Sequence, residues 1–173
     1  MKDTLRILTT LKCNLSCSYC CNNLFKFEQK YLANLNLQEY NNICITGGEP
    51  LLPGKIHLLR HLLLRNELLD ENIFTLPNVY IYTNGIYLNH SLLNFILDFN
   101  KVKGINIGIH PGSNNRILLT HKYLCKNNKI RFMIEDKYKS IINFAEYKGL
   151  NYTVWTRDRC DMPNEDWVLL KDN

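Results

Sequence analysis

The sequence predicts an α/β fold that is built on a mostly parallel sheet. Two observations predict this fold: short β-branched and apolar runs recur along the chain, and segments with helical periodicity lie between them. Strands and helices that alternate in this way favour right-handed crossovers and a parallel sheet that is buried on both faces. A closed eightfold barrel needs roughly 250 residues. A chain of 173 residues therefore predicts either an open, partial barrel or a doubly wound sheet.

Six strands and four helices account for the pattern. The strands are predicted at residues 5–10, 43–46, 79–83, 105–110, 130–135 and 152–156. The helices are predicted at residues 56–69, 91–99, 116–126 and 139–148. Ligand sites gather at the carboxyl ends of parallel strands, so the residues that directly follow each strand are the first candidates for a functional site.

The composition is that of one folded domain, which we expect to span residues 1–173. Hydrophobic residues make up 46% of the chain and charged residues 21%, a balance typical of folded proteins rather than disordered or membrane proteins. The apolar run after Met1 is too short for a secretory signal, and charged side chains interrupt residues 58–69, so we expect no membrane span. The net charge of +5 is spread along the sequence, which gives no strong signal for nucleic-acid binding.

The chain has seven cysteines, an odd number that argues against a full set of structural disulfides. Metal-bound thiolates in a reducing compartment are the favoured explanation, and we expect a cytoplasmic location. Cys13, Cys17 and Cys20 fall in one loop directly after the first predicted strand. Three thiolates so close in sequence suit either an iron–sulfur cluster or zinc.

The number of ligands separates these two metals. A structural zinc site usually takes four protein ligands, and the fourth here would be the adjacent Cys21 or a distant cysteine or histidine. Three protein ligands on a four-iron cluster leave one iron open, and an open iron can bind a substrate or a cofactor. The pattern favours iron–sulfur, with zinc and unligated core cysteines as the alternatives.

The cysteine spacing also carries a resemblance to a known family. Three residues separate Cys13 from Cys17, two separate Cys17 from Cys20, and Tyr19 precedes the last cysteine. This arrangement resembles the defining loop of the radical S-adenosylmethionine superfamily. The resemblance implies a partial (β/α)6 TIM-like barrel with parallel strands, in which these three cysteines bind a 4Fe-4S cluster and Cys21 does not.

A second motif, Gly47-Gly48-Glu49-Pro50, follows the second predicted strand. Its glycines let the backbone come close to a ligand, and the carboxylate of Glu49 can pair with an ammonium group. Taken alone, the motif is also compatible with an ordinary turn. In the superfamily a similar motif receives the amino group of the cofactor's methionine moiety. The resemblance therefore implies that Gly47, Gly48 and Glu49 bind S-adenosyl-L-methionine.

Further cofactor candidates follow the third and fourth strands. Asn84 lies in a Thr-Asn-Gly sequence that is similar to a strand ending in the superfamily, with a plain Asn-Gly turn as the alternative. His110, Ser113 and Arg116 follow the fourth strand, where related enzymes contact the ribose and carboxylate of the cofactor. Helix capping and a solvated surface charge are the ordinary alternatives for such residues.

Substrate-side candidates follow the sixth strand. Arg157 and Arg159 can bind a carboxylate or a phosphate, and mutual compensation with neighbouring acidic residues is the alternative. Cys160 is a candidate hydrogen-atom donor. No cysteine-rich segment follows this strand, so we expect a single cluster.

The resemblance implies an enzyme whose reduced cluster cleaves S-adenosylmethionine to a 5'-deoxyadenosyl radical, which abstracts hydrogen from a substrate. It also implies an external one-electron reductant of the flavodoxin or ferredoxin type and a small-molecule, peptide or protein substrate. Glycyl-radical activases, deazapurine-type synthases and peptide-modifying enzymes all have members of compatible length. The alternative from another class is a non-catalytic zinc or iron–sulfur module.

Overall fold

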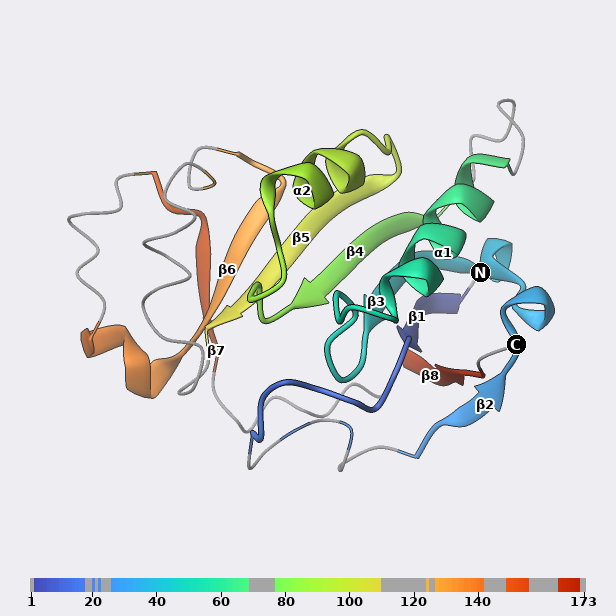
Figure 1. Cartoon of the computed structure of the whole chain (residues 1–173), viewed down its shortest axis with the longest axis horizontal. Helices are drawn as coiled ribbons and strands as arrows, with labels where there is room; N and C mark the ends of the chain where they lie inside the picture. The colour runs from blue at the N-terminus through green and yellow to red at the C-terminus, as the bar shows by residue number, and fades with distance from the viewer. Residues whose placement is uncertain are drawn as a thin grey trace.

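The strands of the computed structural model form a single parallel sheet. The structure describes residues 2–17, 20, 22, 26–68, 77–109, 124, 127–141, 149–155 and 165–171. Within these residues the strand order is β2-β8-β1-β3-β4-β5-β6-β7, and every neighbouring pair is parallel. The predicted α/β class and its parallel sheet are therefore confirmed, and the sheet is open (Figure 1).

Within the described residues the predicted alternation is seen in part, because α-helices lie between β3 and β4 and between β4 and β5. The strands are β1 (Lys2–Leu8), β2 (Glu28–Lys30), β3 (Tyr40–Thr46), β4 (Asn78–Thr83), β5 (Val102–Ile109), β6 (Ile130–Glu135), β7 (Tyr152–Trp155) and β8 (Glu165–Leu170). The α-helices are α1 (Ile56–Leu68) and α2 (His90–Leu97), and 3-10 helices span Leu32–Asn34, Leu37–Glu39 and Asp136–Ile141.

The predicted count of six strands is wrong, because the described residues form eight. The six predicted strands correspond to β1 and to β3 through β7. The two additional strands lie beyond β1, where β8 pairs with β1 and β2 pairs with β8. Neither has an apolar run that begins the strand: β2 is Glu-Gln-Lys, and β8 opens with Glu165 and Asp166. Local pattern therefore gave no signal for them.

The two predicted helices that fall within the described residues are confirmed. Asn89 caps α2, because its side-chain oxygen accepts a hydrogen bond from Leu92 N at 2.9 Å. The helix predicted at residues 116–126 lies outside the described residues, apart from Leu124. The described start of the helix predicted at 139–148 belongs to the 3-10 helix Asp136–Ile141. None of the described helices is long and apolar enough to cross a membrane.

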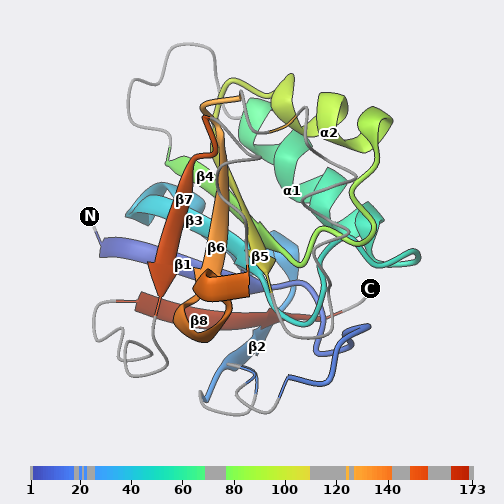
Figure 2. The same cartoon turned by 90° about the vertical axis from the view of Figure 1, so that its left-hand side faces the viewer.

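The core lies between one face of the sheet and the helices. Rows of apolar side chains cross the strands in register, such as Ile7, Ile45 and Ile81, each with 0% of its surface exposed. Helices α1 and α2 pack on this face (Figures 1 and 2). Because alternate residues of a strand point to opposite faces, this apolar row fixes which side chains point away from the helices.

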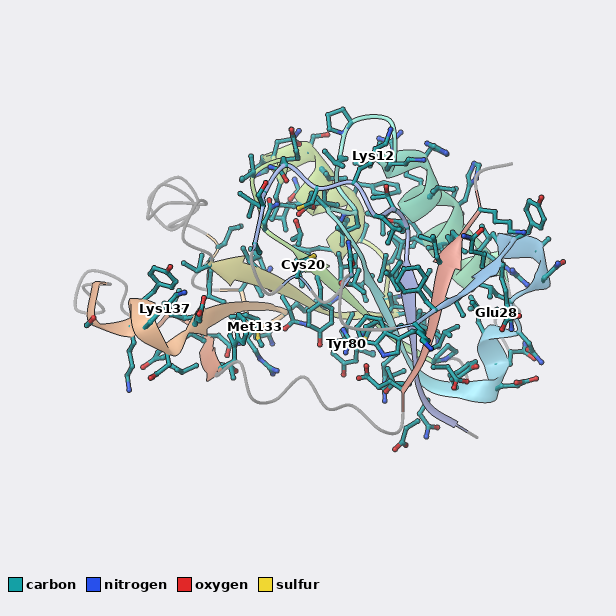
Figure 3. All side chains as sticks on the ribbon, turned by 90° about the horizontal axis from the view of Figure 1, so that it is seen from below. Lys12, Cys20, Glu28, Tyr80, Met133 and Lys137 are labelled. Atoms are coloured by element: carbon teal, nitrogen blue, oxygen red, sulfur yellow. The ribbon has the colours of Figure 1, made fainter. Side chains whose placement is uncertain are left out.

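The opposite face carries polar and aromatic side chains. Tyr80 and Met133 point away from the helices (Figure 3), and Asn106 occupies the same face between them in strand order. The ring of Tyr80 lies so close to Gly104 that a Cβ there would be 3.0 Å from it. The sequence predicts a sheet that is buried on both faces, and within the described residues the α-helices cover one of them.

Candidate metal and cofactor site

The cysteine loop begins where β1 ends. Thr9 N donates to Thr46 O at 3.0 Å, which extends the β1–β3 ladder beyond Leu8. The hydroxyl oxygen of Thr10 then accepts from Lys12 N at 3.0 Å and turns the chain out of the sheet. Cys13 therefore lies directly after the turn that follows β1.

The three predicted ligands are half-buried thiols in this loop. Leu15 N donates to Cys13 Sγ at 3.4 Å, and Cys20 N donates to Cys17 O at 3.2 Å. Each hydrogen bond closes a local turn of the loop. Within the described residues, no group of three His, Cys, Asp or Glu side chains converges closely enough to hold a single metal ion. The thiolates of a cubane cluster bind different irons, so they do not need to converge on one point.

The glycine turn packs directly against the cysteine loop. Glu49 N donates to Lys12 O at 2.9 Å, which joins the two motifs through their backbones. Gly47 and Gly48 have φ angles of 84° and 51°, in the left-handed region that glycine tolerates. A Cβ on Gly47 would overlap Leu8, and a Cβ on Gly48 would overlap the carbonyl of Lys12. Both glycines are therefore required for the close approach.

Glu49 lies beneath this turn, with 0% of its surface exposed. Its Oε1 accepts from the Thr83 hydroxyl at 2.6 Å and from Leu51 N at 3.0 Å, and its Oε2 accepts from Asn84 N at 2.7 Å. Burial raises the pKa of the Glu49 carboxyl, and the three hydrogen bonds oppose that rise in part. Within the described residues the carboxylate forms no ion pair, so its hydrogen-bond donors are all neutral.

Asn84 connects the buried carboxylate to the cysteine loop. It is 5% exposed, and its side-chain amide donates to Asn14 Oδ1 at 2.7 Å and approaches Cys13 Sγ at 3.9 Å. Its own oxygen accepts from Ile86 N at 3.0 Å. The structure thus brings together the predicted residues Cys13, Gly48, Glu49 and Asn84, which come from three different strand ends.

Negative charge accumulates around Cys13. Burial raises the pKa of its thiol; the charges of Glu49 and Cys20 raise it further, whereas hydrogen bonds from Leu15 and Asn14 lower it. A bound metal cation would reverse this balance and keep the thiolate deprotonated. The arrangement is therefore chemically suited to a cationic group that sits between the thiols and the glycine turn.

Three polar residues of the site were not singled out by sequence reasoning. Thr83 belongs to the Thr-Asn-Gly strand ending, and its position next to Asn84 was the available signal. Asn22 has no such signal, yet its amide donates to Leu11 O at 3.4 Å and its oxygen accepts from Gly48 N at 3.5 Å. The buried hydroxyl of Thr9, 1% exposed, has no hydrogen-bond partner among the described residues. A bound ligand or water would satisfy it.

Sequence comparison adds no assignment to this geometry. No family model matches the chain, and no curated protein matches it either. The functional argument therefore rests on the residues and their contacts.

The remaining predicted residues lie outside the described residues. These are the cofactor candidates His110, Ser113 and Arg116, the substrate-side candidates Arg157, Arg159 and Cys160, and the predicted non-ligand Cys21.

A second buried polar cluster lies on the sheet face away from the helices. Arg6 donates from Nε and Nη2 to the two carboxylate oxygens of Glu165, at 2.7 and 2.8 Å. Its guanidinium also lies 4.9 Å from the ring centroid of Tyr82 and 5.0 Å from that of Trp167. Burial alone would lower the pKa of Arg6, but the Glu165 hydrogen bonds and charge outweigh it and raise the pKa. This cluster ties β8 to β1.

Proposed function

We propose that the protein is a radical S-adenosylmethionine enzyme. In this proposal Cys13, Cys17 and Cys20 hold a 4Fe-4S cluster, and Gly47, Gly48 and Glu49 form the cradle for the methionine end of S-adenosyl-L-methionine. The observation that carries the proposal is the contact between the two motifs, in which Glu49 N donates to Lys12 O at 2.9 Å. A cluster on the loop and a cofactor on the turn would then be immediate neighbours.

The donor set fits an iron–sulfur cluster. Three thiols in one loop provide soft ligands for three irons and leave the fourth iron for the cofactor. Leu15 N and the Asn84 amide both approach Cys13 Sγ, and N–H groups that face a sulfur favour its thiolate form. These hydrogen bonds are the outer contacts by which a protein orients and tunes a metal ligand.

The buried carboxylate supports a cationic cofactor. The three donors to Glu49 are neutral, so an ionised carboxylate there would make the electrostatic potential at the glycine turn negative. S-adenosylmethionine carries an ammonium and a sulfonium group, both of which this field would favour. Because Glu49 is fully buried, its contribution would be electrostatic and positional, while the glycine backbone makes the closer approach.

When bound, the reduced cluster supplies the electron that cleaves S-adenosylmethionine and yields a 5'-deoxyadenosyl radical for hydrogen abstraction from the substrate. The chain itself would orient the cofactor at the glycine turn and exclude water around Glu49. We place the substrate on the polar face that carries Tyr80, Asn106 and Met133, which is the interior of a partial barrel in this proposal. An external flavodoxin- or ferredoxin-type reductant and a cytoplasmic location complete it.

The test is anaerobic iron–sulfur reconstitution, reduction with dithionite in the presence of S-adenosylmethionine, and chromatographic detection of 5'-deoxyadenosine. We expect the product to form only when cluster and reductant are both present. Cys20→Ser should lose the cluster iron, and the adjacent control Cys21→Ser should retain it. The reverse pattern would move the ligand register and remove the basis of the family resemblance.

A non-catalytic metal-binding module is the rival that this experiment must exclude. Such a module has no need for the buried Glu49 beneath the glycine turn. Glu49→Gln should therefore weaken S-adenosylmethionine binding to the reconstituted protein. Unchanged cofactor affinity in that variant, with its iron content intact, would remove Glu49 from the cofactor site.

A further inference from the structure

Asn84 occupies the position at which three parts of the site meet. Its backbone N–H donates to the buried Glu49 carboxylate at 2.7 Å, and its side-chain amide donates to Asn14 Oδ1 at 2.7 Å. The same amide nitrogen lies 3.9 Å from Cys13 Sγ. Asn84 is nearly buried and contacts both the carboxylate and the Cys13 thiol. A shift of the carboxylate would therefore also shift the thiol.

We infer that Asn84 is the positioning residue of the cysteine loop. Held from below by Glu49, it fixes where Asn14 and Cys13 lie relative to the glycine turn. Its amide also provides an N–H group that faces the Cys13 sulfur. The effect of that group on the cluster rests on the proposed function, whereas the positioning of the loop does not.

The orientation of the Asn84 amide follows from its partners. Its Oδ1 accepts from Ile86 N at 3.0 Å, so the oxygen must face its own turn. The NH2 group is then directed at the loop, where one proton meets Asn14 Oδ1 and the other faces Cys13 Sγ. A flipped amide would turn the NH2 group of Asn84 toward the N–H of Ile86, so the Ile86 contact admits one orientation.

An N–H group at a ligand sulfur has a definite consequence for a bound cluster. It stabilises the more negative, reduced state relative to the oxidised state, and hydrogen bonds to sulfur are among the groups that set cluster potentials. The Asn84 amide should therefore raise the reduction potential of the cluster. Asn84 would exert this effect through Cys13.

Two variants separate positioning from electrostatics. Asn84→Ala removes the amide and both of its contacts to the loop. Asn84→Asp keeps an oxygen for Ile86 N, and Asn14 can reverse its own amide to donate to the new carboxylate, but a negative oxygen then faces Cys13. Asn94→Ala is the matched control, because Asn94 lies exposed on α2, where its side-chain amide lies 3.1 Å from His90 Nδ1 and far in sequence from the cysteine loop.

The first readout is hydrogen–deuterium exchange of the peptide that covers residues 11–17 in the metal-free protein. Loss of one net hydrogen bond, about 1 kcal/mol, corresponds to roughly fivefold faster exchange where the loop opens locally. We expect that increase in Asn84→Ala, little change in Asn84→Asp and none in Asn94→Ala. Wild-type exchange in Asn84→Ala, at an unchanged melting temperature, would overturn the positioning role.

The second readout is the midpoint potential of the reconstituted cluster, followed by EPR during a redox titration. We expect more negative potentials in both Asn84 variants, with the larger shift in Asn84→Asp. An unchanged potential in Asn84→Asp would refute the electrostatic effect. If no iron binds to the wild-type protein, the proposed function fails, and the exchange experiment on the metal-free protein still decides the positioning role.

Discussion

Arg6 lies in β1 and Glu49 lies in the turn after β3, and these two buried ionisable side chains differ in their partners. Arg6 meets the carboxylate of Glu165 through two hydrogen bonds, and its guanidinium also contacts the rings of Tyr82 and Trp167. Glu49 meets only neutral donors within the described residues. The charge of Arg6 is balanced by Glu165. An ionised Glu49 carboxylate has no such partner within the described residues, so a cationic ligand could pair with it.

The comparison separates a structural site from a candidate functional site. A buried ion pair that satisfies its own hydrogen bonds needs nothing further to be stable. A buried carboxylate without a cation carries a desolvation penalty, which a binding partner of opposite charge would relieve. The second arrangement adjoins the cysteine loop, at the strand ends where parallel sheets hold their ligands. At the same edge the Thr9 hydroxyl has no hydrogen-bond partner within the described residues.

We expect the largest effect from a substitution that breaks the Arg6–Glu165 ion pair. The side chains of Arg6 and Glu165 are 7% and 16% exposed, so Glu165→Ala leaves a buried cation without its carboxylate. We expect a loss of about 3–5 kcal/mol in the free energy of unfolding, measured by urea denaturation. Glu39→Ala, which removes an exposed carboxylate, is the control and should lose less than about 1 kcal/mol. A loss in Glu165→Ala no larger than the control would show that the pair is not needed.

We expect the next largest effect from a substitution that forces the glycine turn away from the cysteine loop. Gly48→Ala places a methyl group against the carbonyl of Lys12 in a backbone with a φ of 51°. Gly54→Ala is a matched control, because Gly54 has a φ of 79° but open space around its Cβ position. We expect about 1–2 kcal/mol of destabilisation from the positive φ in both variants, and about 1–3 kcal/mol more in Gly48→Ala from the overlap. Equal thermal and urea stability of the two variants would contradict the close packing of the turn.

A smaller effect changes the hydrogen bonding of the buried carboxylate. In Glu49→Gln the side-chain oxygen can still accept from Leu51 and Thr83, but the new NH2 group opposes the N–H of Asn84. We expect the free energy of unfolding at neutral pH to fall by about 1–3 kcal/mol. Wild-type stability in this variant would mean that Asn84 N does not depend on the carboxylate.

The smallest effect is a pH dependence that only the Glu49 region should show. Burial raises the pKa of folded Glu49 above its ordinary value of 4.5, so the folded state binds a proton more readily than the unfolded state. This contribution to stability is fully present below pH 4.5 and is lost as the pH rises through the folded pKa. Relative to Glu49→Gln, the wild-type protein should therefore gain stability as the pH falls across that window. A constant difference between the two proteins would show that the pKa is not raised.

The sequence predicts the strands from β1 to β7 in the sheet order but not β8 and β2, which lie beyond β1. Strands such as β3 and β4 carry β-branched runs that point to the helices, so the local pattern was sufficient. Strands β2 and β8 depend on tertiary contacts instead. Glu165 opens β8 with a charge, and it is held in the sheet by Arg6 from the other end of the chain. No local pattern contains that information.

The candidate site also has features that the sequence predicts and features that depend on tertiary contacts. The cysteine spacing and the Gly-Gly-Glu motif are local and visible, and the rule that ligands gather at strand ends predicts their proximity. The burial of Glu49 is different, because it depends on Thr83 and Asn84 from the next strand. The sequence predicts a carboxylate that pairs directly with an ammonium group. The structure shows a carboxylate beneath the turn that is bonded to its neighbours.

The most direct test of the central claim is the EPR spectrum of the reconstituted, dithionite-reduced protein with and without S-adenosylmethionine. If Cys13, Cys17 and Cys20 hold a cluster with an open iron, a 4Fe-4S signal should appear and should change when the cofactor is added. A cluster signal that S-adenosylmethionine leaves unchanged would contradict the open iron. Zinc in place of iron would contradict the assignment of the cysteine loop itself.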